Sequence, residues 1–439
     1  MKVDLRTKFV EAEEFINSIP KFTTKNKPDH TRYFMNLLKN PQESFLTIHV
    51  AGSNGKGSVS AMINQMLILD GKKTGLFISP HLEVLTERFQ INSKNASIED
   101  FLVAFEQVKT AIIQLMKDGY AHPTYFEFLF AVGMMIFYNN GVEVAVLETG
   151  MGGRLDATNV IRSPLVSIIT SISYEHTDVL GDTLPKIAFE KAGIIKQNRP
   201  VVFEGKHEEV NQVIVEQAAK KDATCYPVYP ADRTMKRMDS KGVEFTLAQF
   251  GDKIIRVPFA AQYQAENAAL AVRAGMLLCE MGHLKKESIV NGIELVRWPG
   301  RMEAVGDGII LDGAHNVDGI QVFVEAVKAM ETPRKILLFS MVKEKNYEKV
   351  IDILSSQILW DEVIVTRVKG ERGLDSNELL QLFLRDLSPD MGKSCRIIDD
   401  NGQALEYAKS VKENGTVFCT GSLYLVGELR KIVGGNHND

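Results

Sequence analysis

A glycine-rich turn between an apolar segment and a helical segment is the clearest local signal in this sequence. The run Thr47–Ser58 reads TIHVAGSNGKGS, so an apolar strand leads into three glycines and then into residues of helical period. Backbone N–H groups at such a turn, together with the positive end of a helix, can surround phosphate oxygens. Lys56 adds a point charge, and Ser58 adds a hydroxyl that can face a metal ion.

The turn departs from the strict phosphate-loop pattern GxxxxGK[ST]. Val50 stands where that pattern has its first glycine, and Gly57 separates Lys56 from Ser58. The alternative is a tight strand-to-helix turn with an incidental lysine. We favour the phosphate-binding interpretation because the strand-turn-helix context and the hydroxyl are both present.

An acidic residue follows another apolar segment, at the place where open α/β sheets bind their ligands. Glu148 ends the apolar run Val142–Leu147 and precedes a glycine-rich turn that carries Arg154 and Asp156. Nucleotide phosphates come with magnesium, which prefers oxygen ligands. Glu148 is therefore a candidate magnesium ligand, and an exposed hairpin charge is the alternative.

His176 and Ser79 also come shortly after strand candidates. His176 follows the apolar run Leu165–Thr170, and Ser79 follows Thr74–Ile78. A lone histidine is usually a hydrogen-bonded structural residue, but three strand ends that meet at one edge of a sheet favour a metal site. Ser79 is compatible with a ligand role and with a plain strand-terminating turn.

Three further charged residues lie near the ends of predicted elements. Lys191 lies near the carboxyl end of the helical segment Thr183–Ala192, where a solvated cation interacts favourably with the helix dipole. Asp312 follows a short strand, a position at which an acid often holds a ribose but can equally be structural. Arg301 follows a Pro-Gly pair and could supply charge to a phosphate when two domains close.

These residues require a scaffold of alternating strands and helices. Apolar runs alternate with segments of helical period, which is typical of a parallel sheet covered by helices on both faces. The segment Cys225–Val257 has short alternating runs and predicts a small antiparallel sheet. In the first half of the chain we predict strands at Leu46–Ala51, Thr74–Ile78, Val142–Leu147, Leu165–Thr170 and Pro200–Phe203, and helices at Ser58–Leu69, Ile98–Met116 and Tyr125–Tyr138.

A second series of strands and helices follows the hinge-like segment Arg297–Arg301, where proline and glycine stop the preceding helix. We expect two α/β domains with a cleft between them: residues 1–297 with a mostly parallel, P-loop-type sheet, and residues 298–439 with a Rossmann-like sheet. The remaining helices are predicted at Tyr263–Met281 and Lys286–Val296, and the strands at Ile309–Asp312, Lys335–Ser340, Glu362–Thr366, Cys395–Ile398 and Thr416–Thr420.

The overall composition argues against several classes of protein. The chain has 439 residues, a formal net charge of -5 and four cysteines. Nucleic-acid binding needs an excess of basic residues, which is lacking here. No CxxC pair signals a zinc site or a disulfide framework. The longest uncharged apolar run is shorter than the roughly 18 residues that cross a bilayer, and the amino terminus does not read as a signal peptide. We expect a cytoplasmic protein without a nucleic-acid or membrane partner.

Nine segments together resemble one family, the folylpolyglutamate synthases and dihydrofolate synthases of the Mur ligase superfamily. The resemblance runs in order from about Phe22 to Glu428, nearly the whole chain. Its LETGMGGRLDATN and EKAGI segments are far more specific than any phosphate loop. The segments are HVAGSNGKGS, ISPHL, YFEFLFA, LETGMGGRLDATN, EHTDVLGDTLPKIAFEKAGII, AENAALA, RWPGRME, LDGAHN and GSLYLVGE.

The resemblance implies an ATP-dependent amide ligase of folate biosynthesis and one-carbon metabolism. Such an enzyme joins L-glutamate to a folate or to dihydropteroate through an acyl phosphate, and it releases ADP and phosphate. The family also leads us to expect a monomer. Whether the acceptor is dihydropteroate, a folate or both stays open, because the folate-binding loops vary within the family.

The resemblance also implies roles for individual residues. It implies ATP contacts from Asn54, Gly55, Lys56, Gly57, Ser58, Asn267, Arg301 and Asp312. It implies Mg²⁺, as two ions, held by Ser58, Ser79, Glu148, His176 and Lys191, with Lys191 carbamylated by carbon dioxide. Catalytic roles fall on Lys56, Lys191 and His315, and the pterin-substrate region on Thr124, Tyr125, Phe126, Glu127, Arg154, Leu155 and Asp156.

The chain departs mildly from the family pattern. Ser53 stands where threonine is common, and Val317 stands where a proline often follows the LDGAHN segment. Neither change touches a charge or a metal ligand. Two other functions remain as alternatives: a sister ligase of peptidoglycan or cyanophycin type, and a nucleotide-gated binding or regulatory ATPase without a ligase product.

Overall fold

The computed structural model describes residues 2–20, 26, 28–239, 242–306, 308–343, 346–368, 373–386 and 394–434, which form two compact units. Unit 1 comprises Met1–Thr234, Thr246–Ile255 and Glu266–Val296, and unit 2 comprises Met235–Phe245, Arg256–Ala265 and Arg297–Asp439. The chain therefore passes from one unit to the other several times. The assignment of residues 1–297 and 298–439 to two functional domains stays a prediction.

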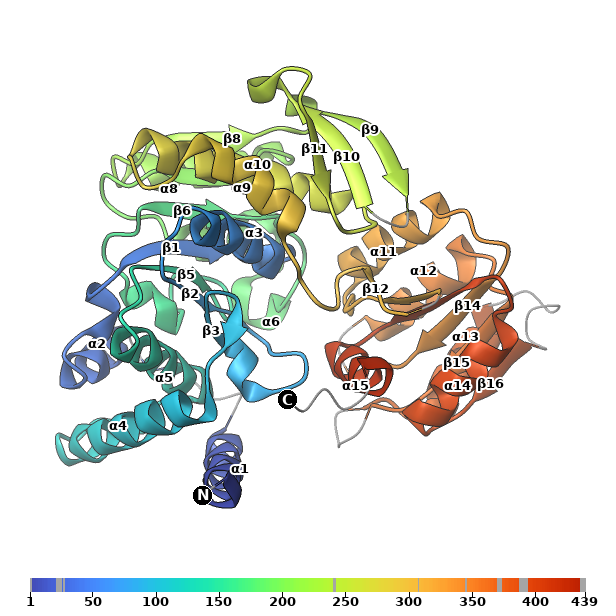
Figure 1. Cartoon of the computed structure of the whole chain (residues 1–439), viewed down its shortest axis with the longest axis horizontal. Helices are drawn as coiled ribbons and strands as arrows, with labels where there is room; N and C mark the ends of the chain where they lie inside the picture. Colours follow the sequence, from blue (N-terminus) through green and yellow to red (C-terminus); the bar gives the residue numbers. More distant parts are fainter. Residues whose placement is uncertain are drawn as a thin grey trace. The chain divides into compact units, whose positions relative to one another are not determined.

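Unit 1 is built on an eight-stranded, mostly parallel sheet in the order β4-β3-β2-β5-β1-β6-β7-β8 (Figure 1). The six strands from β2 to β8 in this order are parallel, and the β3-β4 hairpin extends the sheet in antiparallel pairing. The carboxyl ends of β2, β5, β1 and β6 therefore lie next to one another. The bounds are β1 Leu46–Ala51, β2 Thr74–Phe77, β3 Phe89–Ile91, β4 Lys94–Asn95, β5 Val144–Glu148, β6 Val166–Ile169, β7 Val201–Glu204 and β8 Cys225–Val228.

Strand β8 corrects the expectation that Cys225–Val257 forms one small sheet. β8 pairs in parallel with β7 and so extends the large sheet. Helix α8, Glu208–Ala219, connects the two strands, as the crossover between parallel strands requires. Only the later part of the segment forms the small antiparallel sheet, in the order β11-β10-β9. Its strands are β9 Arg233–Asp239, β10 Gly242–Leu247 and β11 Ile254–Val257.

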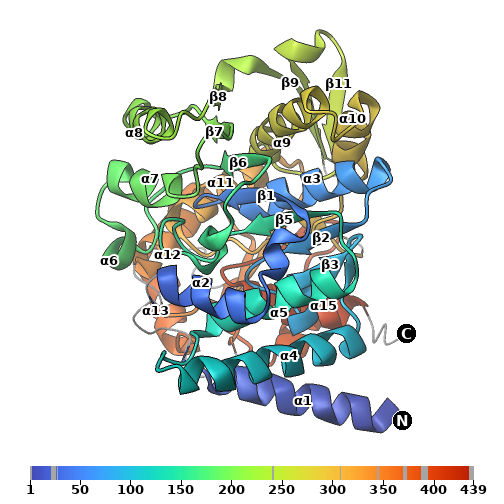
Figure 2. The same cartoon turned by 90° about the vertical axis from the view of Figure 1, so that its left-hand side faces the viewer.

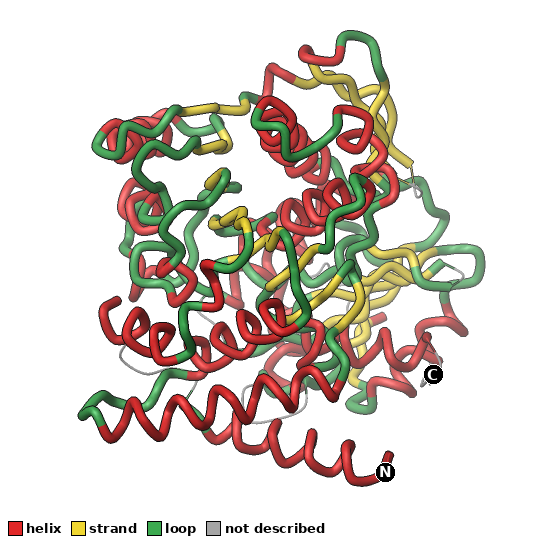
Figure 3. The backbone as a smooth tube through the Cα atoms, turned by 60° about the vertical axis from the view of Figure 1, so that its left-hand side comes forward, coloured by secondary structure: helices red, strands yellow, loops and turns green. Residues whose placement is uncertain are grey.

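Helices cover both faces of the large sheet. Figures 1 and 2 show α4 and α5 on one face, and α3 with α10 on the other. Helix α1 runs alongside α4 (Figure 3), and the rings of Phe9 and Phe101 meet there at 5.1 Å between centroids. The helices not yet bounded are α1 Lys2–Ser18, α2 Pro28–Leu37, α3 Lys56–Leu69, α4 Ile98–Lys117, α5 Tyr125–Asn139, α6 Thr177–Leu180, α7 Leu184–Ala192, α9 Tyr263–Glu280 and α10 Lys286–Leu295. Short 3₁₀ turns occur at Pro41–Glu43, Leu85–Arg88, Ala157–Val160, Pro230–Asp232 and Ala248–Phe250.

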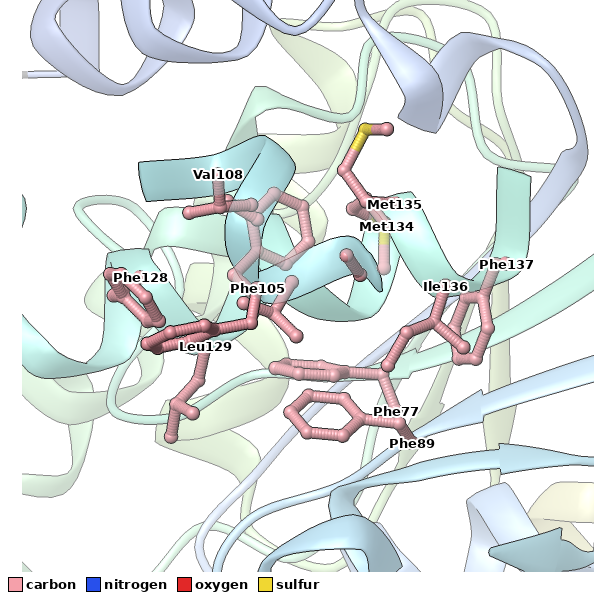
Figure 4. Packing of buried hydrophobic residues seen from close by; sticks show 14 of the residues in the cluster. Phe77, Phe89, Phe105, Val108, Phe128, Leu129, Met134, Met135, Ile136 and Phe137 are labelled. Atoms are coloured by element: carbon pink, nitrogen blue, oxygen red, sulfur yellow. The ribbon is translucent and has the colours of Figure 1, made fainter. Parts of the chain in front are cut away.

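An aromatic cluster fixes α5 against the sheet and against α4 (Figure 4). Phe77 of β2 stacks on Phe89 of β3 at 6.0 Å, and Phe105 of α4 meets Phe128 of α5 at 5.7 Å. Burial of each ring is worth roughly 1.5 to 3 kcal/mol. Because α5 is buried on almost every side, this packing sets the position of its first turn, which carries the predicted substrate residues.

Unit 2 contains a six-stranded sheet in the order β12-β13-β17-β14-β15-β16. The short strand β12 is antiparallel to β13, and the other five strands are parallel. The predicted α/β class is thus confirmed. The strands are β12 Glu303–Ala304, β13 Ile309–Leu311, β14 Lys335–Phe339, β15 Glu362–Val365, β16 Cys395–Ile397 and β17 Thr416–Thr420. The helices are α11 Val317–Ala329, α12 Tyr347–Gln357, α13 Ser376–Asp386, α14 Asn401–Val411 and α15 Leu423–Gly434. Among the described residues, no helix has both the length and the apolarity needed to cross a bilayer.

Candidate active site

The glycine-rich turn links β1 to α3 in a conformation that depends on its glycines. Gly55 has φ 88° and is the N-cap of α3, which begins at Lys56. Gly52 has φ 151°, and a Cβ at this position would overlap the Thr170 hydroxyl. That hydroxyl donates a 2.7 Å hydrogen bond to the carbonyl oxygen of Asn54. The turn is therefore held against the end of β6, with the amino terminus of α3 directly after it.

Lys56 bends back over the turn. Its Nζ donates hydrogen bonds to the carbonyl oxygens of Gly52 at 2.9 Å and Ser53 at 3.0 Å. Ser58, the third residue of α3, is buried. The positive charge of Lys56 is thus fixed at the loop. An incidental lysine would be expected to extend into solvent instead.

Ser79 and Glu148 lie together at the ends of adjacent strands. Glu148 is the last residue of β5, is only 4% exposed, and accepts a 3.3 Å hydrogen bond from the Ser79 N–H. β5 also pairs with β1, with Glu148 opposite Val50. The structure therefore brings both residues to the edge at which β1 enters the glycine-rich turn.

Lys191 is fully buried and lies at the same turn. Its Nζ donates a 2.7 Å hydrogen bond to the Gly52 carbonyl and a 2.5 Å hydrogen bond to Glu175 Oε1. The carbonyl of Gly52 thus accepts hydrogen bonds from two lysines on different helices. Burial lowers the pKa of Lys191 to about 8; the nearby Lys56 charge also lowers it, against the opposing effect of Glu175. A substantial neutral fraction of the amine follows near pH 8.

Glu175 is the functional candidate that sequence reasoning missed. Burial alone would raise its pKa, but Lys191, Lys56 and His176 outweigh that effect and lower it to about 2. His176 follows directly, as the N-cap of α6 with φ 44°. The one signal in the sequence was that Glu175 directly precedes His176, a predicted metal ligand. Its partner Lys191 is 16 positions away, so the ion pair could not be predicted from the sequence.

The donor set is compatible with magnesium. Ser58, Ser79 and Glu148 offer hard oxygen ligands, which Mg²⁺ prefers. Among the described residues, no three His, Cys, Asp or Glu side chains gather as a metal site. Lys191 donates hydrogen bonds as an amine in this structure, and a protonated amine cannot ligate a cation.

The first turn of α5 is a closed hydrogen-bond network. Thr124 caps the helix, and the Glu127 carboxylate accepts the Thr124 N–H at 2.8 Å. The same carboxylate accepts hydrogen bonds from Asn26 and Thr31, at 2.8 and 3.0 Å. Glu127 therefore ties the start of α2 to the start of α5.

The two aromatic residues of this turn pack in different directions. Phe126 packs on the backbone at Gly150, where an added Cβ would approach its ring within 2.7 Å. The buried Tyr125 ring lies under the Arg88 guanidinium, with 5.9 Å from Cζ to the ring centroid. Phe126 therefore connects the first turn of α5 with the loop that follows β5.

Within that loop, the predicted substrate residues fall into two groups. The buried Asp156 carboxylate accepts hydrogen bonds from the backbone N–H groups of Gly150, Met151 and Thr158, at 2.9 to 3.0 Å. It therefore holds the loop in shape. Arg154, by contrast, is half-exposed and pairs with Glu190 at 2.9 Å, and Leu155 is 38% exposed.

In unit 2, Asp312 organises the segment after β13. Its carboxylate accepts the N–H groups of Met302 and Ala314, both at 2.9 Å, and the Tyr263 hydroxyl at 3.3 Å. Burial raises its pKa, against the lowering effect of the Arg301 charge. Tyr263 is a second residue that the sequence did not single out.

His315 and Asn267 have defined surroundings within their own units. The Nδ1 atom of His315 lies 2.8 Å from the Gly313 carbonyl oxygen in unit 2, so Nδ1 carries the proton and Nε2 is the acceptor in the neutral ring. Asn267 of unit 1 lies against the glycine-rich turn, because a Cβ on Gly55 would overlap its Oδ1.

Comparisons with known proteins agree with this architecture. Residues 50–275 match the Mur ligase middle domain, and residues 300–423 match the Mur ligase, glutamate ligase domain. The chain is 32% identical over 435 residues to the dihydrofolate synthase/folylpolyglutamate synthase of Bacillus subtilis, covering 97% of this chain and 99% of that protein.

Solved structures give the same result. The crystal structure of a folylpolyglutamate synthase from Thermotoga maritima has a TM-score of 0.84 at 28% identity, over 99% of this chain and 98% of that one. The Mycobacterium tuberculosis folylpolyglutamate synthase complexed with ADP and AMPPCP has a TM-score of 0.87 at 26% identity, over 98% and 99% of the two chains. The chain therefore belongs to the folylpolyglutamate synthase and dihydrofolate synthase family of the Mur ligase superfamily.

Proposed function

We propose that this chain is an ATP-dependent ligase that joins L-glutamate to the carboxylate of a folate or of dihydropteroate. The names of its relatives and the nucleotides bound to the M. tuberculosis enzyme support this activity. One observation in this chain carries the proposal furthest: Lys56 and Lys191 both donate to the Gly52 carbonyl of a glycine-rich turn at a helix amino terminus. The Lys56 charge and the N–H groups at that helix terminus suit a triphosphate, and Lys191 is placed at the same turn as the metal ligand proposed below.

The reaction has two steps. The γ-phosphoryl group of ATP moves to an oxygen of the acceptor carboxylate, the bond to ADP breaks, and an acyl phosphate forms. The glutamate amine then attacks the acyl carbon. A C–N bond forms, the C–O bond to phosphate breaks, and the nitrogen loses a proton. ADP and phosphate are the by-products.

The electrostatic task is to bring an anionic carboxylate to an anionic phosphate. In the proposed mechanism, Lys56 and the N–H groups at the start of α3 neutralise the phosphoryl oxygens, an effect that grows as charge develops in the transition state. Bound Mg²⁺, held by Ser58, Ser79, Glu148, His176 and modified Lys191, would supply Lewis-acid charge stabilisation. Two ions are part of the proposal.

Carbamylation of Lys191 is part of the same proposal. The neutral amine nitrogen attacks the carbon of CO₂, an N–C bond forms, one C–O π pair moves to oxygen, and the nitrogen loses a proton. The lowered pKa of Lys191 favours this step because it enlarges the neutral fraction of the amine. The product turns a cation into an anionic oxygen ligand.

The remaining site residues are proposed in their inherited roles. Asn54, Gly55, Gly57 and Asn267 would contact the nucleotide in unit 1, and Arg301, Asp312 and His315 would act from unit 2. For the pterin substrate we propose contacts from Thr124, Tyr125, Phe126, Glu127, Arg154, Leu155 and Asp156. Arg154 and Leu155 reach solvent, so we propose that they contact the substrate directly. Glu127 and Asp156 are buried and hydrogen-bonded to backbone and neighbouring side chains, so we propose that they shape the substrate site.

Product analysis tests this function. The purified protein is incubated with ATP, Mg²⁺ and glutamate, with dihydropteroate or tetrahydrofolate as acceptor, and products are identified by mass spectrometry. A mass gain of one glutamate residue on either acceptor is expected, with equal release of ADP. Product formation only with a UDP-sugar acid would favour the sister-ligase alternative. ATP hydrolysis independent of acceptor and amino acid would favour the regulatory ATPase.

A cytoplasmic, monomeric enzyme without nucleic-acid or membrane partners completes the proposal. The four cysteines are all free thiols, which suits a reducing compartment. Light scattering on a sizing column should give a mass near 49.0 kDa.

A further inference from the structure

The side chain of Asn267 places helix α9 against the glycine-rich turn. Asn267 is 6% exposed, and it occupies the space into which a Cβ on Gly55 would project. Gly55 itself is in the left-handed region, with φ 88°, at the N-cap of α3. A small shift of the first turns of α9 would therefore move Asn267 relative to the N–H groups at the start of α3.

A largely buried ion pair holds this part of α9. Arg233 is the first residue of β9, and its Nη2 lies 2.5 Å from Oε1 of Glu266, the residue before Asn267. The two side chains are only 11% and 24% exposed. Screening by water is weak at such exposure, and a guanidinium has a fixed planar geometry, so this pair constrains position more than an exposed pair would.

Arg233 also acts on a second acid. Glu204 ends β7, and burial together with the Glu266 charge raises its pKa to about 7, while Lys206 and Arg233 lower it. Gly205, the next residue, lies under the Tyr229 ring, where an added Cβ would come within 2.7 Å of Cδ1. Arg233 thus pairs directly with Glu266 and, together with Lys206, opposes the effect of burial on Glu204.

We propose that Arg233 is a positioning residue for nucleotide binding, which holds Glu266 so that Asn267 stays on the glycine-rich turn and which cancels acidic charge that would oppose a triphosphate. The inference rests on the proposed ATP-dependent activity. Arg233 itself is assigned no contact with ATP, so its effect is transmitted through the start of α9.

The test compares three variants with a matched control. Arg233→Met removes the charge and the ion pair, Arg233→Lys keeps the charge but not the planar fork, and Glu266→Gln removes one of the two acids. Arg396→Met is the control, because it breaks the 2.6 Å pair with Glu362 inside unit 2. Calorimetry gives the Kd for AMPPCP with Mg²⁺, steady-state rates give KM for ATP and for glutamate, and thermal unfolding monitors the fold.

For Arg233→Met we expect Kd for the analogue and KM for ATP to rise roughly tenfold, with KM for glutamate unchanged. Arg233→Lys should recover part of this loss. Glu266→Gln should weaken binding less than Arg233→Met, because it also removes a negative charge. The control should bind the analogue as the wild type does.

Two results would overturn the inference. One is a folded Arg233→Met protein with wild-type affinity for the analogue. The other is a rise in KM that is equal for ATP and for glutamate and that parallels the fall in Tm, which would show that Arg233 only supports the fold. Failure of the proposed function looks different: the wild type binds the analogue but forms no glutamylated product, and the Kd comparison still decides the role of Arg233. A wild type that binds no nucleotide contradicts both.

Discussion

Lys56 offers the most direct test at the scale of single residues. Its amine is fixed over the turn by two backbone carbonyls, so Lys56→Ala should remove charge without disturbing a packed core. We expect kcat to fall by about 10² to 10⁴, because the charge acts most strongly in the transition state. Steady-state kinetics together with circular dichroism check this. A folded variant with near wild-type turnover would refute the role.

Lys191 should be equally necessary, but for a different reason. Lys191→Ala removes the proposed carbamate, and short carboxylates such as formate or acetate should restore part of the activity by taking its place. Rates with and without added carboxylate provide the measurement. Mass spectrometry and metal titration that find an unmodified lysine in fully active enzyme would contradict the carbamate.

Glu204 predicts a pH dependence of stability. Its pKa is about 7 in the folded protein against 4.5 as the ordinary value, so the folded state binds this proton more tightly than the unfolded state. The stabilisation that comes from this tighter proton binding by Glu204 is fully present below pH 4.5 and is lost as pH rises through 7. Glu204→Gln should therefore gain roughly 2 to 3 kcal/mol relative to the wild type at pH 8, and almost nothing at pH 4.5.

Urea unfolding at several pH values measures this difference. Glu216→Gln, at an exposed position of α8, serves as the control. A gain that does not change with pH would show that packing, rather than ionisation of Glu204, is responsible.

Sequence reasoning identified part of the candidate site and missed residues that depend on tertiary placement. Glu148 and Ser79 were found because parallel strands end at one edge, and the structure brings them into contact. Glu175 was missed because its meaning comes from Lys191, a residue on another element. The structural role of Asp156 in holding its loop could not be predicted either, because three N–H groups converge on its carboxylate only in the folded loop.

At the scale of elements, hydrophobic pattern predicted most strands within one or two residues. β1 and β17 have the bounds that the sequence indicated. Cys225–Val228 was assigned to the wrong sheet because a short, partly buried edge strand shows no periodicity that distinguishes a parallel from an antiparallel neighbour. The β3-β4 hairpin and β12 were not predicted, because strands of two or three residues carry too little pattern.

The packing of α10 on α3 gives a prediction about these elements. Gly292 of α10 faces Met66 of α3, and an added Cβ would lie 2.8 Å from the Met66 backbone nitrogen. Because backbone cannot move aside cheaply, Gly292→Ala should lower the free energy of unfolding by about 1 to 3 kcal/mol.

Denaturant titration measures that change. Gly434→Ala, at the end of α15 and with open space around the new methyl group, should be close to neutral. Equal stability of the Gly292→Ala protein and the wild type would mean that the two helices separate freely.

At the scale of the whole molecule, nucleotide binding should appear as added stability. AMPPCP with Mg²⁺ at a hundred times its Kd is expected to stabilise the folded protein by about 2.7 kcal/mol, because a ligand that binds only the folded state shifts the unfolding equilibrium. Thermal unfolding at increasing analogue concentration measures this. Lys56→Ala should show a much smaller shift at the same concentration, and an identical shift would separate the lysine from nucleotide binding.

The interleaving of the two units has a consequence for how the protein is made. Since unit 1 ends at Val296 and unit 2 already includes Met235–Phe245 and Arg256–Ala265, a ribosome releases parts of the second unit before the first is finished. A single cut cannot divide the gene into two fragments that each encode one intact unit. Truncation after residue 297 would leave the two unit 2 segments that precede it without the rest of their unit, so expression of residues 1–297 alone should give an aggregation-prone product.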